Sequence, residues 1–97
     1  MFLGKILKSV KGSQRNIPIK GISFNSKKVK KNFIFFAIEG NKVSGAKYIK
    51  EAISYGASVV VSEKKIKLPI EKVTFVLVKD SRKSLAEASS NFYKKKT

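Results

Sequence analysis

The residues best suited to hold a ligand lie at the ends of two expected strands. A polar turn, Asn25-Ser26-Lys27, follows the first strand, and a loop from Gly40 to Gly45 follows the second and precedes a helix. The Ser26 hydroxyl can both donate and accept a hydrogen bond. Backbone N–H groups of a loop at a helix N-terminus attract anions, each charge gaining about 0.3–1 kcal/mol. The two segments together predict a site for a ligand that carries phosphate.

The chain has few groups that could catalyse a reaction. Its 97 residues include no cysteine and no histidine, which excludes thiolate chemistry and the commonest general base. Asp80-Ser81-Arg82 is expected to begin a helix as its N-cap. The remaining carboxylates have no spacing typical of an acid–base pair, and we expect them to be solvated: Glu39, Glu51, Glu63, Glu71 and Glu87. Binding without turnover is the expected activity.

The net charge of +16 suggests a nucleic-acid partner, but the distribution of the cations argues against one. Almost all are lysines, with Arg15 and Arg82 the two arginines, whereas recognition of bases and phosphates favours the bidentate guanidinium. The lysines are scattered along the whole chain. We therefore expect solvated surface lysines and no nucleic acid, with a small basic nucleic-acid-binding domain as the alternative.

The periodicity of apolar residues predicts an α/β fold with the order αββαββα, in a small open, mostly parallel sheet with flanking helices. No apolar run approaches the roughly 20 residues needed to cross a bilayer, so membrane insertion is not expected. Residues 1–97 are expected to form a single domain. The expected helices are 2–10, 46–55 and 81–93, and the expected strands are 17–24, 33–38, 57–62 and 73–78.

From Gly21 to Tyr93 the chain resembles the N-terminal domain of the Mur ligases. The resemblance covers about three-quarters of the chain and is closest to the MurE-type members, which add the third residue of the peptidoglycan stem peptide. The sequence departs from the family pattern where Asn25, Lys27 and Ser44 replace Asp, Arg and Asp. The matching segments are Asn25-Ser26-Lys27, Phe33 to Gly40, Ser44-Gly45, Gly56-Ala57 with Val59 to Val61, Val73 to Val78, and Asp80 to Leu85 with Phe92-Tyr93.

The resemblance implies that this domain binds the uridine diphosphate end of a UDP-N-acetylmuramoyl-peptide. Phe24 would lie against the uracil ring, unless it is an ordinary core aromatic, and Ser26 would contact the uracil edge or a phosphate oxygen. The diphosphate would meet the loop residues Asn41, Lys42 and Val43, with Lys42 adding a point charge. These five residues are the candidate substrate-binding site.

The resemblance also implies a parent enzyme larger than this chain. Family members are cytoplasmic, ATP-dependent amide ligases that work through an acyl-phosphate, with ATP and Mg²⁺ in a central domain that carries a Gly-x-Gly-Lys-Thr loop. This chain is therefore expected to be a fragment, monomeric, without the ATP site, and inactive alone. The third residue would be diaminopimelate or lysine. Alternatives are the MurF-type sibling, which adds D-alanyl-D-alanine, and a stand-alone interaction domain without a nucleotide ligand.

Overall fold

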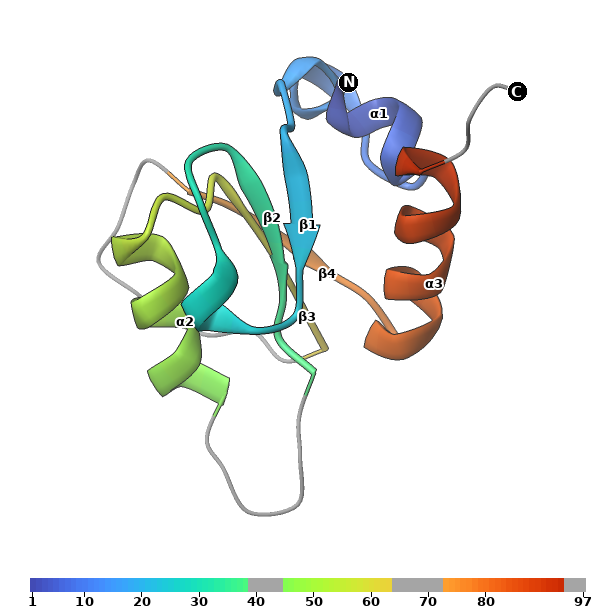
Figure 1. Ribbon diagram of the computed structural model, residues 1–97. Coiled ribbons are helices and arrows are strands. Elements are labelled where there is room, and N and C mark those ends of the chain that lie inside the picture. Colours follow the sequence, from blue (N-terminus) through green and yellow to red (C-terminus); the bar gives the residue numbers. More distant parts are fainter. Residues whose placement is uncertain (39–44, 64–72, 94–97) are drawn as a thin grey trace.

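A four-stranded parallel sheet lies at the centre of the protein (Figure 1). The computed structural model describes residues 1–38, 45–63 and 73–93. The strands follow one another across the sheet in chain order, each parallel to its neighbour. This confirms the predicted α/β class, and every described pair of strands is parallel. The strands are β1 (Gly21–Ser23), β2 (Phe33–Phe36), β3 (Val59–Ser62) and β4 (Thr74–Leu77).

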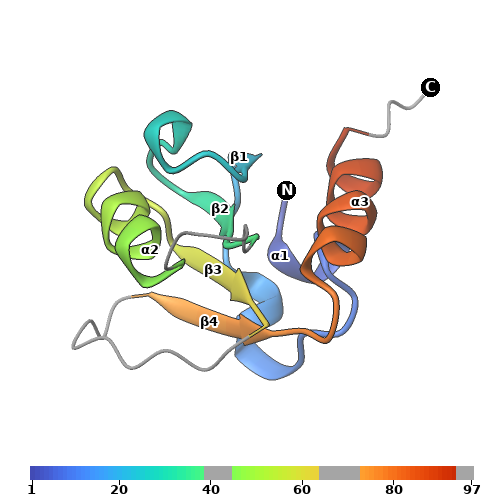
Figure 2. The ribbon, with the colours of Figure 1, turned by 90° about the horizontal axis from the view of Figure 1, so that it is seen from below.

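Helices cover both faces of the sheet. Figure 2 shows α2 (Gly45–Ser54) on one face, with α1 (Leu3–Ile6) and α3 (Ser81–Phe92) together on the other. Two short 3₁₀ helices, η1 (Gly12–Asn16) and η2 (Ser26–Lys28), lie in the connections. Apart from these two turns, the order of elements is the predicted αββαββα.

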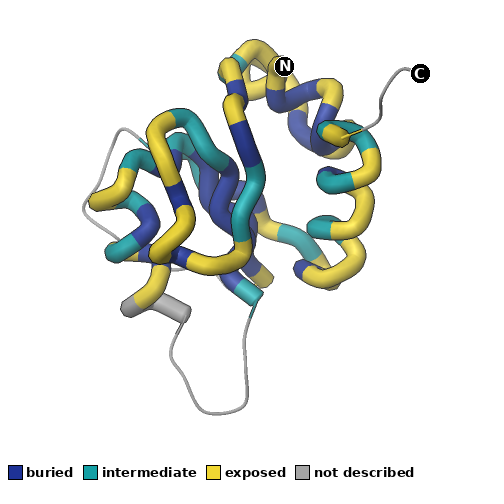
Figure 3. The backbone as a smooth tube through the Cα atoms, viewed as in Figure 1, coloured by how far each residue is buried: buried dark blue, intermediate teal, exposed yellow. Residues whose placement is uncertain are grey.

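The strands at the centre of the protein are largely buried (Figure 3). Their buried residues alternate between two apolar clusters. Side chains of successive strand residues point to opposite faces, so Ile34 and Phe36 join the cluster of α1 and α3, while Phe35 joins the cluster of α2. All four residues of β3 are buried. Burial on both faces explains the nearly unbroken apolar runs in the sequence, as is usual for strands of a parallel sheet.

The N-terminal helix is much shorter than the predicted 2–10. It ends at Ile6, since the next residue, Leu7, has an extended backbone with a φ of −121° and a ψ of 103°. The Leu3 N–H donates to the Ile17 carbonyl and the Ile19 N–H donates to the Met1 carbonyl, at 2.9 and 2.8 Å. Beyond the helix, Arg15 Nη1 donates to the Val10 carbonyl at 3.1 Å. Side chains at helical spacing still reach the core, since Leu7 and Val10 are buried.

The predicted strand 17–24 is divided between two partners. Pro18 forms an isolated antiparallel bridge with Phe2, whereas only Gly21–Ser23 pairs with β2. Phe24 lies outside the strand and is exposed. The other strands differ from their predicted bounds by one or two residues at an end.

Two turns have the backbone conformations expected from their residues. Gly56, after α2, has a φ of 117°, and Asn32, before β2, has a φ of 67°. Their backbones meet, because the Asn32 N–H donates to the Gly56 carbonyl at 3.0 Å. In the described part of the chain, no helix is long and apolar enough to span a bilayer.

Candidate functional site

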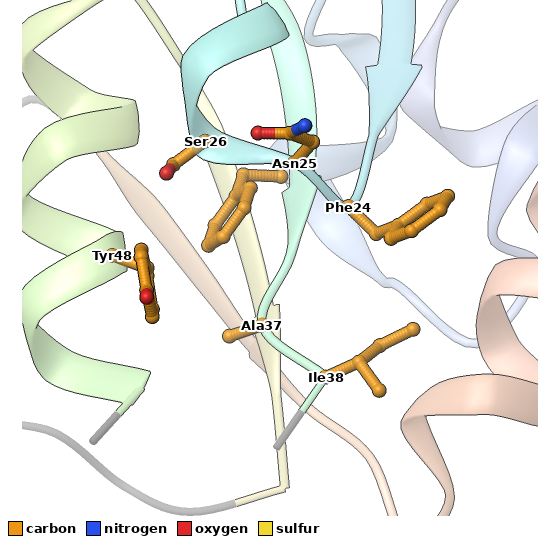
Figure 4. Close-up of a pocket in the computed structure, with 7 residues that line it drawn as sticks. Phe24, Asn25, Ser26, Ala37, Ile38 and Tyr48 are labelled. Carbon is orange, nitrogen blue, oxygen red and sulfur yellow. The ribbon is translucent and has the colours of Figure 1, made fainter. Parts of the chain in front are cut away.

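A cavity of about 320 Å³ lies where β1 and β2 end, beside α2. The carboxyl ends of parallel strands are where open α/β sheets bind ligands. Figure 4 shows Tyr48 on α2 with Ser26 pointing toward that helix, Phe24 and Ile38 on the opposite side, and Ala37 between them. The lining residues are Phe24, Asn25, Ser26, Phe35, Ala37, Ile38 and Tyr48.

Phe24 is a surface residue, so the alternative of an ordinary core aromatic is wrong. Its side chain is 66% exposed. It lines both the main cavity and a neighbouring hollow of about 310 Å³ beside β1. A large aromatic ring held at the rim of a cavity offers an apolar face to a planar ligand.

Ser26 lies at the start of η2, in a turn that Asn25 holds in place. The Asn25 Oδ1 accepts a hydrogen bond from the Lys27 N–H at 3.0 Å, which caps η2. Ser26 is buried, and its Oγ donates to the Glu51 Oε1 on α2. The expectation that Glu51 is only solvated is therefore wrong, since its carboxylate is partly buried and bonded to the turn.

The sequence did not single out Tyr48, Ala37 and Ile38 as site residues. Tyr48, on α2, is 39% exposed and lines the cavity. Ala37 and Ile38 immediately follow β2. The rule that strand ends carry the site could have identified these two, whereas the position of Tyr48 depends on how α2 packs.

The predicted diphosphate contacts cannot be placed beside the cavity, because Asn41, Lys42 and Val43 lie outside the described residues. Described residues flank this segment on both sides, Ile38 two residues after β2 and Gly45 at the start of α2. The segment therefore joins two elements that border the cavity, and its role in binding stays a prediction.

Two carboxylates hold the start of α3, next to the end of β3. Asp80 Oδ1 accepts from the Lys83 N–H at 3.0 Å, which confirms the predicted N-cap. Glu63 Oε2 accepts from the Ser81 N–H and from its Oγ, at 2.7 and 2.9 Å. The Ser81 backbone bond, followed by the hydroxyl bond, lowers the pKa of Glu63 below its usual value. Glu63 thus has a capping role beyond the solvation expected of it.

The groups that line the cavity are of types that can bind a ligand. Its lining residues carry aromatic rings, aliphatic side chains, one amide and two hydroxyls, those of Ser26 and Tyr48, with the Glu51 carboxylate behind the serine hydroxyl. Among residues 1–38, 45–63 and 73–93, no three His, Cys, Asp or Glu side chains are grouped as a metal site would need. The arrangement suits a planar, uncharged ring with polar edges.

Comparisons with known proteins identify similar chains. A family model described as "Mur ligase family, catalytic domain" matches residues 18–93. The chain is 41% identical over 99 residues to the UDP-N-acetylmuramoyl-L-alanyl-D-glutamate--2,6-diaminopimelate ligase of Clostridium tetani, covering 96% of this chain and 20% of that one. It is 45% identical over 82 residues to the ligase of the same name from Rickettsia prowazekii, covering 84% and 17%. The chain thus spans about a fifth of the length of these relatives.

Solved structures with the same fold include two ligases. The crystal structure of MurF ligase from Thermotoga maritima in complex with ADP is 28% identical, with a TM-score of 0.59, over 72% of this chain and 16% of that one. The UDP-N-acetylmuramoylalanyl-D-glutamyl-2,6-diaminopimelate--D-alanyl-D-alanyl ligase from Acinetobacter baumannii has a TM-score of 0.66 over 92% of this chain and 20% of that one. At 18% identity, the second likeness concerns the fold alone.

Proposed function

Since this chain belongs to the Mur ligase family, we propose that it binds the uridine diphosphate end of UDP-N-acetylmuramoyl-L-alanyl-D-glutamate. The observation that carries the proposal is the cavity at the carboxyl ends of β1 and β2. It brings together Phe24 and Ser26, two of the residues that the family motifs assign to the substrate. In this reading the uracil ring enters the cavity, with Phe24 at its face and Ser26 at its edge.

The size of the cavity is sufficient for a base. Its volume of about 320 Å³ is at the lower end of the range for small-molecule sites, about 300–1,000 Å³. The diphosphate would leave the cavity toward the segment that follows Ile38. Asn41, Lys42 and Val43, which lie outside the described residues, would bind it through backbone N–H groups and one ammonium, groups that suit an anion.

We further propose that the parent protein is an ATP-dependent ligase that adds 2,6-diaminopimelate, as the names of its relatives state for them. The MurF-type sibling is the weaker alternative, because the MurF structures match at lower identity. The residues of this chain do not fit ATP or Mg²⁺. The chain contains no Gly-x-Gly-Lys-Thr segment, and its described residues hold no acidic cluster.

The domain would therefore contribute binding without turnover. The nucleotide end of the substrate is far from the reacting carboxylate. Contacts with that end hold the substrate in place, so that less entropy is lost when the reacting groups meet. Fixing uracil and diphosphate here would present the peptide to the ATP-binding part of the parent.

The proposal is tested by NMR titration of the ¹⁵N-labelled chain with UDP and with UDP-N-acetylmuramoyl-L-alanyl-D-glutamate. Amide shifts are expected at Phe24, Ser26 and Tyr48. Phe24→Ala should weaken binding about tenfold or less, as expected for one aromatic contact. Leu77→Ala is the matched control, because Leu77 is also exposed (56%) but lies on β4 away from the cavity.

Two results would contradict the proposal. One is the absence of shifts around the cavity with either uridine ligand. The other is binding of oligonucleotides alone, with an affinity that falls steeply as salt increases, which is the behaviour of the nucleic-acid alternative.

A further inference from the structure

A hydrogen bond behind the cavity joins residues that are 25 positions apart. The Ser26 Oγ donates to the Glu51 Oε1. Ser26 is only 4% exposed, yet it lines the cavity, whereas Glu51 is not among the lining residues. Glu51 thus acts on the cavity through Ser26.

The bond decides which hydrogen bonds Ser26 can offer a ligand. A hydroxyl has one proton and two acceptor lone pairs. The proton of Ser26 is directed at a carboxylate, an acceptor that binds hydroxyls strongly. Within the described parts of the chain, no group donates to the Ser26 Oγ. Its lone pairs are therefore not used by any described residue.

We propose that Glu51 is a positioning residue that holds the Ser26 hydroxyl as a hydrogen-bond acceptor and so selects a base whose ring nitrogen carries a proton. The inference rests on the proposed uridine site and deepens it. Uracil presents N3–H, a donor, at the position where cytosine presents an unprotonated N3, an acceptor. A fixed hydrogen-bond acceptor at this point therefore favours binding of uracil and disfavours binding of cytosine.

The charge of Glu51 also determines which part of the ligand Ser26 can contact. A phosphate oxygen at Ser26 would need a hydrogen bond from the serine proton, which is already donated to Glu51. The phosphate would also lie near the negative charge of the Glu51 carboxylate. The serine therefore meets the base and not the diphosphate. This choice was open in the sequence, where a serine in a polar turn suited either group.

The helix places Glu51 correctly for this role. Glu51 follows Tyr48 by three positions on α2, so the two side chains lie on the same face of the helix. Tyr48 lines the cavity and Glu51 holds the turn beside it. One face of α2 thus contributes both a wall and the group that orients the serine.

The test compares UDP and CDP binding by calorimetry or NMR titration in four proteins. The unaltered chain should prefer UDP. Glu51→Ala should lower this preference about tenfold, the worth of roughly one hydrogen bond, because the freed hydroxyl can rotate and donate to cytosine N3. Glu51→Gln should keep most of the preference, since its amide oxygen still accepts the serine proton. Glu87→Ala, which removes an exposed carboxylate from α3, should change nothing.

Each other result has a distinct meaning. If the unaltered chain binds neither nucleotide, the proposed function itself fails. If the unaltered chain binds UDP and CDP with equal affinity, only the inference is overturned. The inference is also overturned if Glu51→Ala lowers the affinities for UDP and CDP by the same factor. Should Glu51→Ala fail to fold, Ser26→Ala and Glu51→Gln decide the question. If Ser26→Ala loses the preference for UDP over CDP while Glu51→Gln keeps it, the inference is supported. Any other pattern of the two variants overturns it.

Discussion

The aromatic ring of Phe33 lies over the α-carbon of Gly21. The two residues are partners in the β1–β2 ladder, and a Cβ built on Gly21 would come within 2.4 Å of the Phe33 Cζ. Glycine therefore leaves room for the ring on β1, the strand that leads directly to Phe24 and the cavity.

Gly21→Ala should destabilise the protein by about 1–3 kcal/mol, because the added methyl forces the Phe33 ring from its place. The measurement is the free energy of unfolding by urea. In a Phe33→Leu background the same substitution should cost clearly less, since the ring is gone. Equal costs in the two backgrounds would contradict the assigned contact.

Gly56→Ala should also destabilise the protein, here by backbone strain and a backbone clash. Gly56 has a φ of 117°, and a Cβ would lie 2.7 Å from the Lys31 Cα. We expect a loss of more than about 1 kcal/mol. Gly12→Ala is the control, because Gly12 has a φ of 66° with nothing within 4 Å of the built Cβ. A smaller loss at Gly56 than at Gly12 would count against the clash.

Asp80→Ala should lower the free energy of unfolding by about 1 kcal/mol, the usual cost of losing an N-cap. The Asp80 carboxylate holds the Lys83 N–H at the start of α3. Asp80→Asn keeps an acceptor at the same position and should cost much less. Thermal unfolding of the three proteins measures the difference, and identical melting temperatures would argue against the cap.

Glu63→Gln should destabilise the protein only where Glu63 is ionised. Because the Ser81 hydrogen bonds lower the pKa of Glu63 from its ordinary 4.5, the ionised form stabilises the fold above that pH, and this stabilisation is lost as the pH falls through the lowered value. The difference in unfolding free energy between the two proteins should therefore be constant near neutral pH and should decrease as the pH falls below 4.5. A difference that widens in acid would refute this.

Tyr48→Ala should weaken UDP binding by about three- to tenfold, because the ring forms one wall of the cavity. Tyr55→Ala is the matched control, since Tyr55 is exposed just after α2 and does not line the cavity. Affinities from NMR titration check the prediction. Equal effects of the two substitutions would show that the wall contributes nothing specific.

Local patterns in the sequence were enough to predict the class of fold, whereas the family was predicted from the resemblance of its motifs. Unbroken apolar runs such as Phe33–Phe36 predict buried parallel strands, and a capping aspartate such as Asp80 predicts a helix start. Both depend on interactions between near neighbours in the chain. The position of Phe24 and Ser26 at strand ends followed from the same patterns.

Tertiary structure decided what depends on distant partners. Pairing of residues 1–3 with residues 17–19 divided the first strand, because Pro18 forms a bridge with Phe2 and only Gly21–Ser23 pairs with β2. Packing of α2 against η2 moved Tyr48 to the cavity and brought Glu51 to Ser26. A sequence specifies that Ser26 has a hydroxyl, but only the folded chain determines where its proton points.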